Sequence, residues 1–175
     1  MTTLEAVLGD ITTEHVDVVV NAANSALLGG GGVDGAIHAA AGPALLEQCR
    51  ELRRTTHRAG LEVGDAVATG AGDLPCRWVV HTVGPNRHRG QTHPARLASC
   101  FASSLAVARG LGARSIAFPA VSAGVYGWDV EEVARVAVAT VRSECATHDG
   151  IDLVRFVLFG HRALAAFETA LADRS

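Results

Sequence analysis

Short apolar runs alternate with longer stretches of helical periodicity along nearly the whole chain. The most apolar run reads Val-Asp-Val-Val-Val, and β-branched residues in such a run favour a buried strand. Six runs predict strands: Leu4–Leu8, Val16–Val20, Ala66–Ala68, Trp78–Val83, Ser115–Phe118 and Leu153–Phe159.

The stretches between these runs predict helices. Pro43 and Pro94 suit the first position of a helix, and Asp129 suits the N-cap of the next one. The expected helices are Gly32–Ala41, Pro43–Arg54, Pro94 to the glycines at Gly110 and Gly112, Val130–Ala146 and Ala163–Ala172. Strands that alternate with helices indicate an α/β domain, with several parallel strands and helices on both faces of the sheet. Ligands of such domains bind at the carboxyl ends of the strands.

Composition narrows the class of protein. A chain of 175 residues, 49% hydrophobic and 19% charged, is expected to form one globular domain with a single core. The formal net charge of −3 argues against a general nucleic-acid surface, which would need to be basic. An anionic ligand would therefore be held by local main-chain dipoles rather than by bulk positive charge.

Cysteine spacing and the amino-terminal segment give no sign of a metal, an export signal or a membrane span. Cys49, Cys76, Cys100 and Cys145 are scattered and form no Cys-x-x-Cys pair. The start of the chain lacks the basic and apolar regions of a signal peptide, and no apolar run approaches the ~20 residues that span a bilayer. We expect a cytoplasmic protein with reduced thiols, no bound metal and no membrane contact.

A glycine-rich loop follows the valine-rich run and leads into an alanine-rich helix. It contains four successive glycines, Gly29–Gly32, each of which loses more backbone entropy on folding than alanine would. Such a loop favours close approach of main-chain amides to an anion, although a flexible surface loop is the alternative. It is not a Walker A loop, because no Gly-Lys-Ser/Thr follows, and a Rossmann match lacks the acidic residue about twenty positions later.

A second loop, Phe118–Asp129, also connects an apolar run to a helix. Its small residues Ser122, Ala123 and Gly124 would expose amides. Tyr126 and Trp128 supply either flat walls for a ligand or caps on the core. Two loops of this kind suit a diphosphate flanked by sugars.

Together these segments resemble the macrodomain family, in particular its MacroD-type branch. The resemblance runs in family order over nearly the whole chain. The segments that carry it are Gly9–Thr12, Asn21–Asn24, Gly29–His38, His81–Pro85 and Phe118–Gly127.

The resemblance implies a single macrodomain over residues 1–175, with three α/β/α layers around a mixed, largely parallel sheet of about six strands. It also implies an ADP-ribose cleft. Asp10 and Ile11 would hold the adenine, and Phe159 would stack on it unless it is an ordinary core residue. The implied ligand-binding residues are Asp10, Ile11, Ala22, Gly29, Gly30, Gly31, Gly32, Val33, Ser122, Ala123, Gly124, Val125, Tyr126 and Phe159.

The resemblance further implies that Asn24 and Asp34 are catalytic. Hydrolysis of an ester on the distal ribose needs a positioned water and stabilisation of developing negative charge. Asp34 would orient or deprotonate the water and Asn24 would fix the ribose hydroxyls; N-capping of the following helix is the alternative for Asp34. His38 and His81 are weaker candidates, expected to be structural. No cofactor or metal is implied.

The expected activity is removal of single ADP-ribose units from glutamate and aspartate side chains of proteins. O-acetyl-ADP-ribose and ADP-ribosylated nucleic-acid ends are further expected substrates. The protein is expected to act as a monomer. A non-catalytic ADP-ribose reader is the alternative, and hydrolysis of ADP-ribose 1″-phosphate is a third reading. Departures from the family pattern at Ala123, Trp128–Asp129, Leu61–Gly64 and Gly160–His161 leave the substrate preference open.

Overall fold

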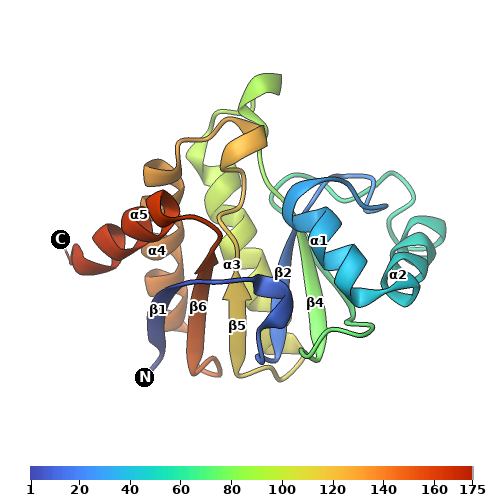
Figure 1. Ribbon diagram of the computed structural model, residues 1–175, viewed down its shortest axis with the longest axis horizontal. Coiled ribbons are helices and arrows are strands. Elements are labelled where there is room, and N and C mark those ends of the chain that lie inside the picture. Colours follow the sequence, from blue (N-terminus) through green and yellow to red (C-terminus); the bar gives the residue numbers. More distant parts are fainter. Residues whose placement is uncertain (175) are drawn as a thin grey trace.

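Six strands form one mixed sheet in a computed structural model that describes residues 1–174 (Figure 1). The strands are β1 (Thr3–Leu8), β2 (Val18–Ala23), β3 (Ala66–Gly70), β4 (Trp78–Val83), β5 (Ser115–Phe118) and β6 (Leu153–Leu158). Their order is β1-β6-β5-β2-β4-β3, and every neighbouring pair is parallel except β3 with β4. The predicted mixed, largely parallel sheet of six strands is confirmed.

Within residues 1–174, five α-helices cover the two faces of this sheet (Figure 1). They are α1 (Gly32–Ala41), α2 (Pro43–Arg54), α3 (Pro94–Gly110), α4 (Val130–Thr147) and α5 (His161–Ala172). Residues of α1 and α2 share a core with Val19 and Val79, whereas α3, α4 and α5 pack against Val18, Val20 and Val80. Because side chains alternate along a strand, these two sets belong to opposite faces, and the domain has three layers.

Four phenylalanines link the sheet to the helices on the α3–α5 face. Phe101, Phe118, Phe156 and Phe167 are fully buried and contact one another in series, with ring centroids 5.1, 6.0 and 4.9 Å apart. Aromatic pairs at such distances add to the stability gained from burial alone. This packing fixes β5 and β6, from which two of the functional loops depart.

Several boundaries differ from the expected ones. Strand β2 begins at Val18 instead of Val16 and continues through Ala23, because Asn21 to Ala23 pair with β4. Before β2, the main-chain oxygen of Asp17 accepts hydrogen bonds from the amides of Arg77 and Trp78 at the start of β4. Strand β6 stops at Leu158 and α5 begins two residues earlier than expected. Asp129 precedes α4 as predicted, but its side chain makes no capping hydrogen bond.

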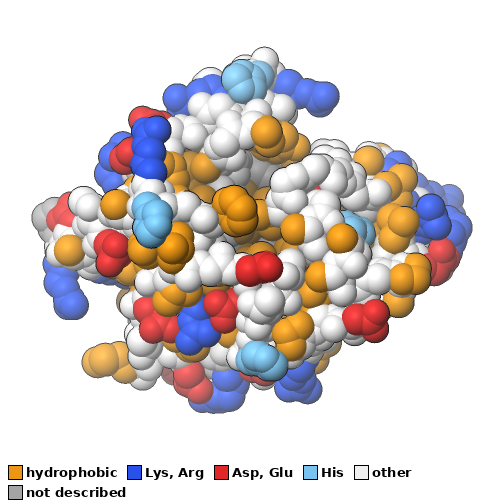
Figure 2. Space-filling model, viewed as in Figure 1, with side chains coloured by type: hydrophobic (Ala, Val, Ile, Leu, Met, Phe, Trp, Pro, Cys, Tyr) orange, Lys and Arg blue, Asp and Glu red, His pale blue; other side chains and the backbone are white. Residues whose placement is uncertain are grey.

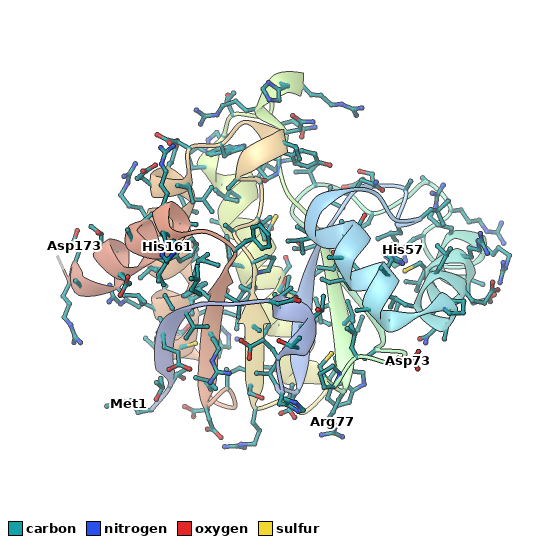
Figure 3. The ribbon with its side chains drawn as sticks, viewed as in Figure 1. Met1, His57, Asp73, Arg77, His161 and Asp173 are labelled. Atoms are coloured by element: carbon teal, nitrogen blue, oxygen red, sulfur yellow. The ribbon has the colours of Figure 1, made fainter. Side chains whose placement is uncertain are left out.

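The carboxyl ends of the parallel strands meet at one edge of the sheet. Met1 and Arg77, which precede β1 and β4, lie at the lower edge in Figure 3, so the loops that follow the strands leave from the upper edge. This is the edge at which α/β sheets bind ligands. Within residues 1–174, no helix combines the length and apolar character that crossing a bilayer requires.

Candidate active site

The first glycine-rich loop joins β2 to α1, and the residues before its glycines are anchored to the rest of the protein. Leu27 is buried and adopts a positive φ of 61°, while the Leu61 amide donates to the Ser25 carbonyl at 2.9 Å. A side chain placed on Gly31 or Gly32 would meet no atom within 4 Å. The start of α1 carries no side-chain cap, so its first amides face this open space and are available to an anion.

Asp34 lies in the first turn of α1, beside that open space. The N-cap position belongs to Gly31, so the N-cap interpretation of Asp34 is wrong. The Asp34 side chain is buried and its Oδ1 accepts a 2.8 Å hydrogen bond from the Asn21 amide. Burial raises the pKa of Asp34, and the Asn21 hydrogen bond opposes part of that rise. A carboxylate with a raised pKa beside an open glycine-rich loop is suited to accept a proton.

Asn24 and Asp34 flank Gly30. A Cβ atom on Gly30 would lie 3.1 Å from Asp34 Oδ2 and 3.4 Å from Asn24 Nδ2. The Asn24 amide donates to the Gly29 carbonyl at 3.1 Å, and its buried Oδ1 has no hydrogen-bond partner within residues 1–174. The structure therefore brings both predicted catalytic residues to one point of the loop, with an amide oxygen still to be satisfied.

The second loop follows β5 and is anchored through Ser122. This residue is buried with a positive φ of 69°, and its Oγ donates to the Pro85 carbonyl at 2.8 Å. Gly84 lies so close that any side chain there would overlap Ser122. Beyond this anchor, Gly124 has open space around it and Val125 is 86% exposed. The predicted small-residue loop is therefore fixed at its base and open at its tip.

Trp128 and Arg87 have structural roles. Trp128 is buried in the core on the α3–α5 face, which excludes its interpretation as a ligand wall. The Arg87 guanidinium stacks 4.3 Å above its ring and forms an ion pair with Glu132 at 3.1 Å. Tyr126, by contrast, is half-buried at the end of the loop.

A third group of predicted residues lies where β1 and β6 end. The Gly9 amide donates to the Leu158 carbonyl at 3.0 Å, which brings Asp10 and Phe159 to the same edge. Asp10 accepts from the amide and hydroxyl of Thr12, and these bonds lower the pKa of Asp10. Phe159 is 94% exposed, so its interpretation as a core residue is wrong. Ile11 is buried beside Asp10.

The order of the strands arranges these groups in a row. Along the sheet the order β6-β5-β2 places the Phe159 group first, the Ser122–Tyr126 loop next and the Asn24–Asp34 group last. Ala22 stands apart, because it lies within β2 and its side chain packs against the core. Figure 2 shows hydrophobic side chains around a hollow in the middle of the face turned to the viewer. Basic and histidine side chains lie on the projection at the top of the same view.

Three polar residues near Asp34 carried only a weak signal in the sequence. His38 Nε2 lies 3.4 Å from Asp34 Oδ1, as the one-turn spacing of the two residues allows. Asn21 and His81 are fully buried and 3.2 Å apart beneath Asp34. The sequence marks Asn21 only as part of the segment Asn21–Asn24, and its direct contact with Asp34 depends on the packing of α1 on β2.

No group of three or more His, Cys, Asp or Glu side chains in the described part of the chain is arranged to hold a metal ion. The four cysteines are free, and three of them are buried.

Known proteins share this sequence and fold. A family model described as Macro domain matches residues 20–137. The chain is 57% identical to a macro domain-containing protein of Streptomyces griseus over 96% of its length and 94% of the relative's. It is 50% identical to an O-acetyl-ADP-ribose deacetylase of Klebsiella pneumoniae over 97% of its own length and 96% of that enzyme's.

Solved structures lead to the same family. An Oceanobacillus iheyensis macrodomain with ADP superposes with a TM-score of 0.93 at 42% identity, covering 97% of this chain and 90% of the other. The sequence match and the shared six-stranded fold together show that the chain belongs to the macro domain family.

Proposed function

We propose that this protein binds ADP-ribose across the row of loops and hydrolyses esters on the distal ribose. Adenine would lie at Asp10, Ile11 and Phe159, where an exposed aromatic ring is available for stacking. The diphosphate would lie between Gly29–Val33 and Ser122–Tyr126. The name of the Klebsiella relative, a deacetylase of O-acetyl-ADP-ribose, supports both the ligand and the class of reaction.

Main-chain amides are the expected partners of the diphosphate. The protein carries a net charge of −3, so no general positive field draws in an anion. The uncapped start of α1 and the open surfaces of Gly31, Gly32 and Gly124 provide local dipoles instead. Residues without side chains at these positions let the main chain approach the phosphates closely.

The distal ribose would lie between Asn24 and Asp34. Water attacks the ester carbonyl and Asp34 accepts one of its protons. The acyl group leaves as a carboxylic acid, and the released ribose oxygen takes up a proton to become a hydroxyl. The unpartnered Oδ1 of Asn24 would accept a hydrogen bond from a ribose hydroxyl and hold the sugar in place.

The same chemistry extends from O-acetyl-ADP-ribose to ADP-ribose on glutamate and aspartate side chains, because each substrate is an acyl ester of the ribose. ADP-ribosylated nucleic-acid ends present a phosphate ester instead, with the same ribose in the cleft. The proposed macromolecular partners are proteins modified on glutamate or aspartate and, in addition, ADP-ribosylated nucleic-acid ends. The distal ribose ester is the feature that all acyl substrates share.

One observation carries the proposal: Asp34 Oδ2 and Asn24 Nδ2 lie against the same point of a glycine loop that is open above. The experiment compares release of acetate from O-acetyl-ADP-ribose and of ADP-ribose from a glutamate-linked protein by the wild type and Asp34→Ala. Calorimetry measures ADP-ribose binding by both. Asp149→Ala is the matched control, since Asp149 is exposed in the loop between α4 and β6 at the opposite edge.

We expect turnover by the wild type and the control, and a strong loss in Asp34→Ala with ADP-ribose affinity within about tenfold, or ~1.4 kcal/mol. Equal loss of binding and turnover would show that Asp34 is structural. If all three proteins bind ADP-ribose and none of them, the wild type included, releases product, the protein is a reader and the hydrolase is rejected.

A further inference from the structure

A chain of buried polar side chains runs from Asp34 into the sheet. Asn21 Nδ2 lies 2.8 Å from Asp34 Oδ1 and 3.2 Å from His81 Nδ1. On the other side of the ring, His81 Nε2 lies 2.9 Å from Thr69 Oγ1, which in turn donates to the Gly70 carbonyl at 2.9 Å. Asn21 and His81 have no exposed surface, and Asp34 and Thr69 are 5% and 6% exposed.

With Asp34 ionised, one arrangement of donors and acceptors fits this chain, and it leaves the buried Oδ1 of Asn21 without a hydrogen-bond partner among residues 1–174. The Asp34 carboxylate accepts, so the Asn21 atom that faces it must be the amide nitrogen. The reverse orientation would press the Asn21 oxygen against a carboxylate oxygen. The Asn21 nitrogen can then only donate to His81 Nδ1, which must carry no proton.

The proton of neutral His81 is therefore on Nε2, which donates a hydrogen bond to Thr69 Oγ1. The Thr69 hydroxyl in turn donates a hydrogen bond to the Gly70 carbonyl. Burial lowers the pKa of His81 to about 3, which keeps the ring neutral across the working range of pH.

The two oxygens of Asp34 have different surroundings. Oδ1 takes the contacts with Asn21 and His38, at 2.8 and 3.4 Å. Oδ2 is the atom that lies 3.1 Å from the Cβ position of Gly30, on the side of Asn24. A carboxylate held through one oxygen presents the other in a fixed direction, and positioning of this kind is worth a large factor in rate.

We infer that Asn21 and His81 are positioning residues for Asp34: His81, protonated on Nε2, orients the Asn21 amide, which holds Oδ1 and leaves Oδ2 facing the distal ribose. This inference rests on the proposed hydrolase function. The titratable groups packed around Asp34 are His38 on α1, Cys49 on α2 and His81 on β4. Burial raises the pKa of Cys49 to about 11, so its thiol stays neutral.

Two variants of His81 separate positioning from mere packing. Asparagine places an amide oxygen near the site of Nδ1, where it can still accept from Asn21. Glutamine reaches the site of Nε2 and keeps the contact with Thr69 but removes the acceptor for Asn21. Both replace an aromatic ring by a smaller amide, so both lose similar packing, and thermal unfolding checks that the two destabilise alike.

We expect His81→Gln to lower kcat at least about tenfold with ADP-ribose Kd within about threefold, and His81→Asn to keep kcat within about threefold of the wild type. The acid limb of the pH–rate profile should also move to higher pH in His81→Gln, because the Asn21 hydrogen bond lowers the pKa of Asp34. Equal losses of kcat in the two variants would overturn the inference.

A measurement without turnover tests the arrangement in the free wild-type protein. Nitrogen NMR of the histidine rings distinguishes a protonated Nε2 from a protonated Nδ1. A neutral His81 with its proton on Nε2 supports the inference, and a charged ring or a proton on Nδ1 rejects it. This result is independent of the hydrolase assay, so absence of turnover by the wild type would reject the proposed function alone.

Discussion

Replacement of Gly35 by alanine sets two opposing effects against each other. Gly35 lies in α1, where alanine is favoured over glycine by about 1 kcal/mol. However, an added Cβ would lie 2.5 Å from the Gly30 carbonyl oxygen, where ordinary contacts begin at 3.4 Å. The Gly30 main chain would have to move by roughly 0.9 Å, and overpacking of this size costs about 1–3 kcal/mol.

The predicted balance is a loss of up to about 2 kcal/mol in the free energy of unfolding, with a larger effect on function. Gly30 lies between Asn24 and Asp34, and a displacement near 1 Å at a reacting centre can cost about 100-fold in rate. We expect kcat/KM on O-acetyl-ADP-ribose to fall about 10- to 100-fold, and ADP-ribose affinity to weaken with it.

Gly110→Ala is the matched control. Gly110 ends α3, and its Cβ position has no neighbour within 4 Å. This change should raise stability by up to about 1 kcal/mol without altering binding or turnover. Chemical denaturation and calorimetry on both variants provide the measurements. If Gly35→Ala stabilises the protein as the control does and leaves kcat/KM unchanged, the close approach of α1 to the loop is not a functional constraint.

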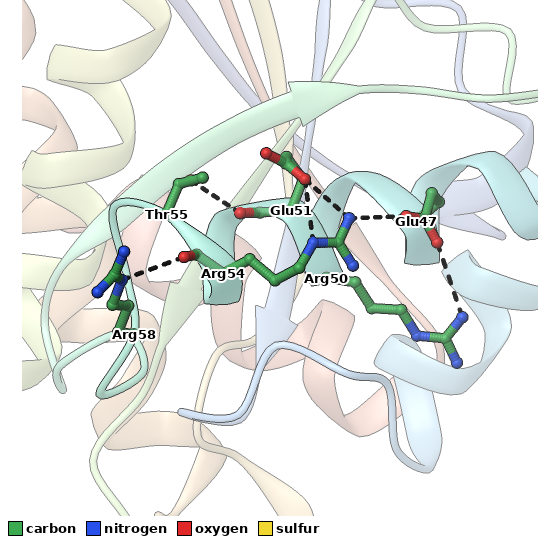
Figure 4. Close-up of polar contacts among 6 residues, drawn as sticks. All are labelled: Glu47, Arg50, Glu51, Arg54, Thr55 and Arg58. Atoms are coloured by element: carbon green, nitrogen blue, oxygen red, sulfur yellow. Dashed lines mark hydrogen bonds and ion pairs between the residues drawn. The ribbon is translucent and has the colours of Figure 1, made fainter.

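Three further results are expected. Phe159→Ala should weaken ADP-ribose binding by about 10- to 100-fold, because stacking on a base is worth ~1–3 kcal/mol. Thermal unfolding should stay unchanged, since the ring is 94% exposed. An unaltered affinity in calorimetry would place the adenine elsewhere. Turnover should fall with decreasing pH at a midpoint above 3.8, the ordinary pKa of aspartate. Burial raises the pKa of Asp34, and only its carboxylate form accepts a proton. A midpoint at or below 3.8 in the pH profile of kcat would contradict this role. Arg54→Ala should change neither turnover nor the midpoint of thermal unfolding. Arg54 forms ion pairs with Glu47 at 2.9 Å and with Glu51 at 2.7 Å (Figure 4), but these pairs are solvent-exposed and contribute little to stability. A clear fall of the midpoint in calorimetric melting would show that the network on α2 stabilises the fold.

The elements that the sequence predicted well are those with a strong local signal. Pro43 and Pro94 begin α2 and α3 as expected, and the runs Trp78–Val83 and Ser115–Phe118 are strands with the expected bounds. These segments carry either proline at a helix start or a run rich in β-branched and aromatic residues, and both are strong local signals. The two glycine-rich loops also lie at the carboxyl edge of the sheet, as the alternation of strands and helices implied.

The less predictable features depend on contacts between distant segments. Asn21 reads as the start of a loop, yet it lies in β2 because β4 pairs with it. Phe159 ends the expected strand Leu153–Phe159, so the pattern alone left a core residue open beside the stacking role, but β6 ends before it and leaves the ring exposed. Trp128 lies in a ligand-like loop, and only the packing of Arg87 and the α4 core against it shows that it is structural.

The pairing of β2 with β4 places Asn21 directly opposite His81. The preceding valines, Val18 to Val20, would fit several alignments almost equally well, because each presents the same side chain to the core. A slip by one residue would turn Asn21 to the apolar α3–α5 face and leave His81 opposite Val20 or Ala22, depending on the direction. Each buried polar group left unpaired costs about 1–3 kcal/mol, so the polar pair penalises misaligned strands during folding. The side chains that orient Asp34 therefore also select the native register of the central sheet.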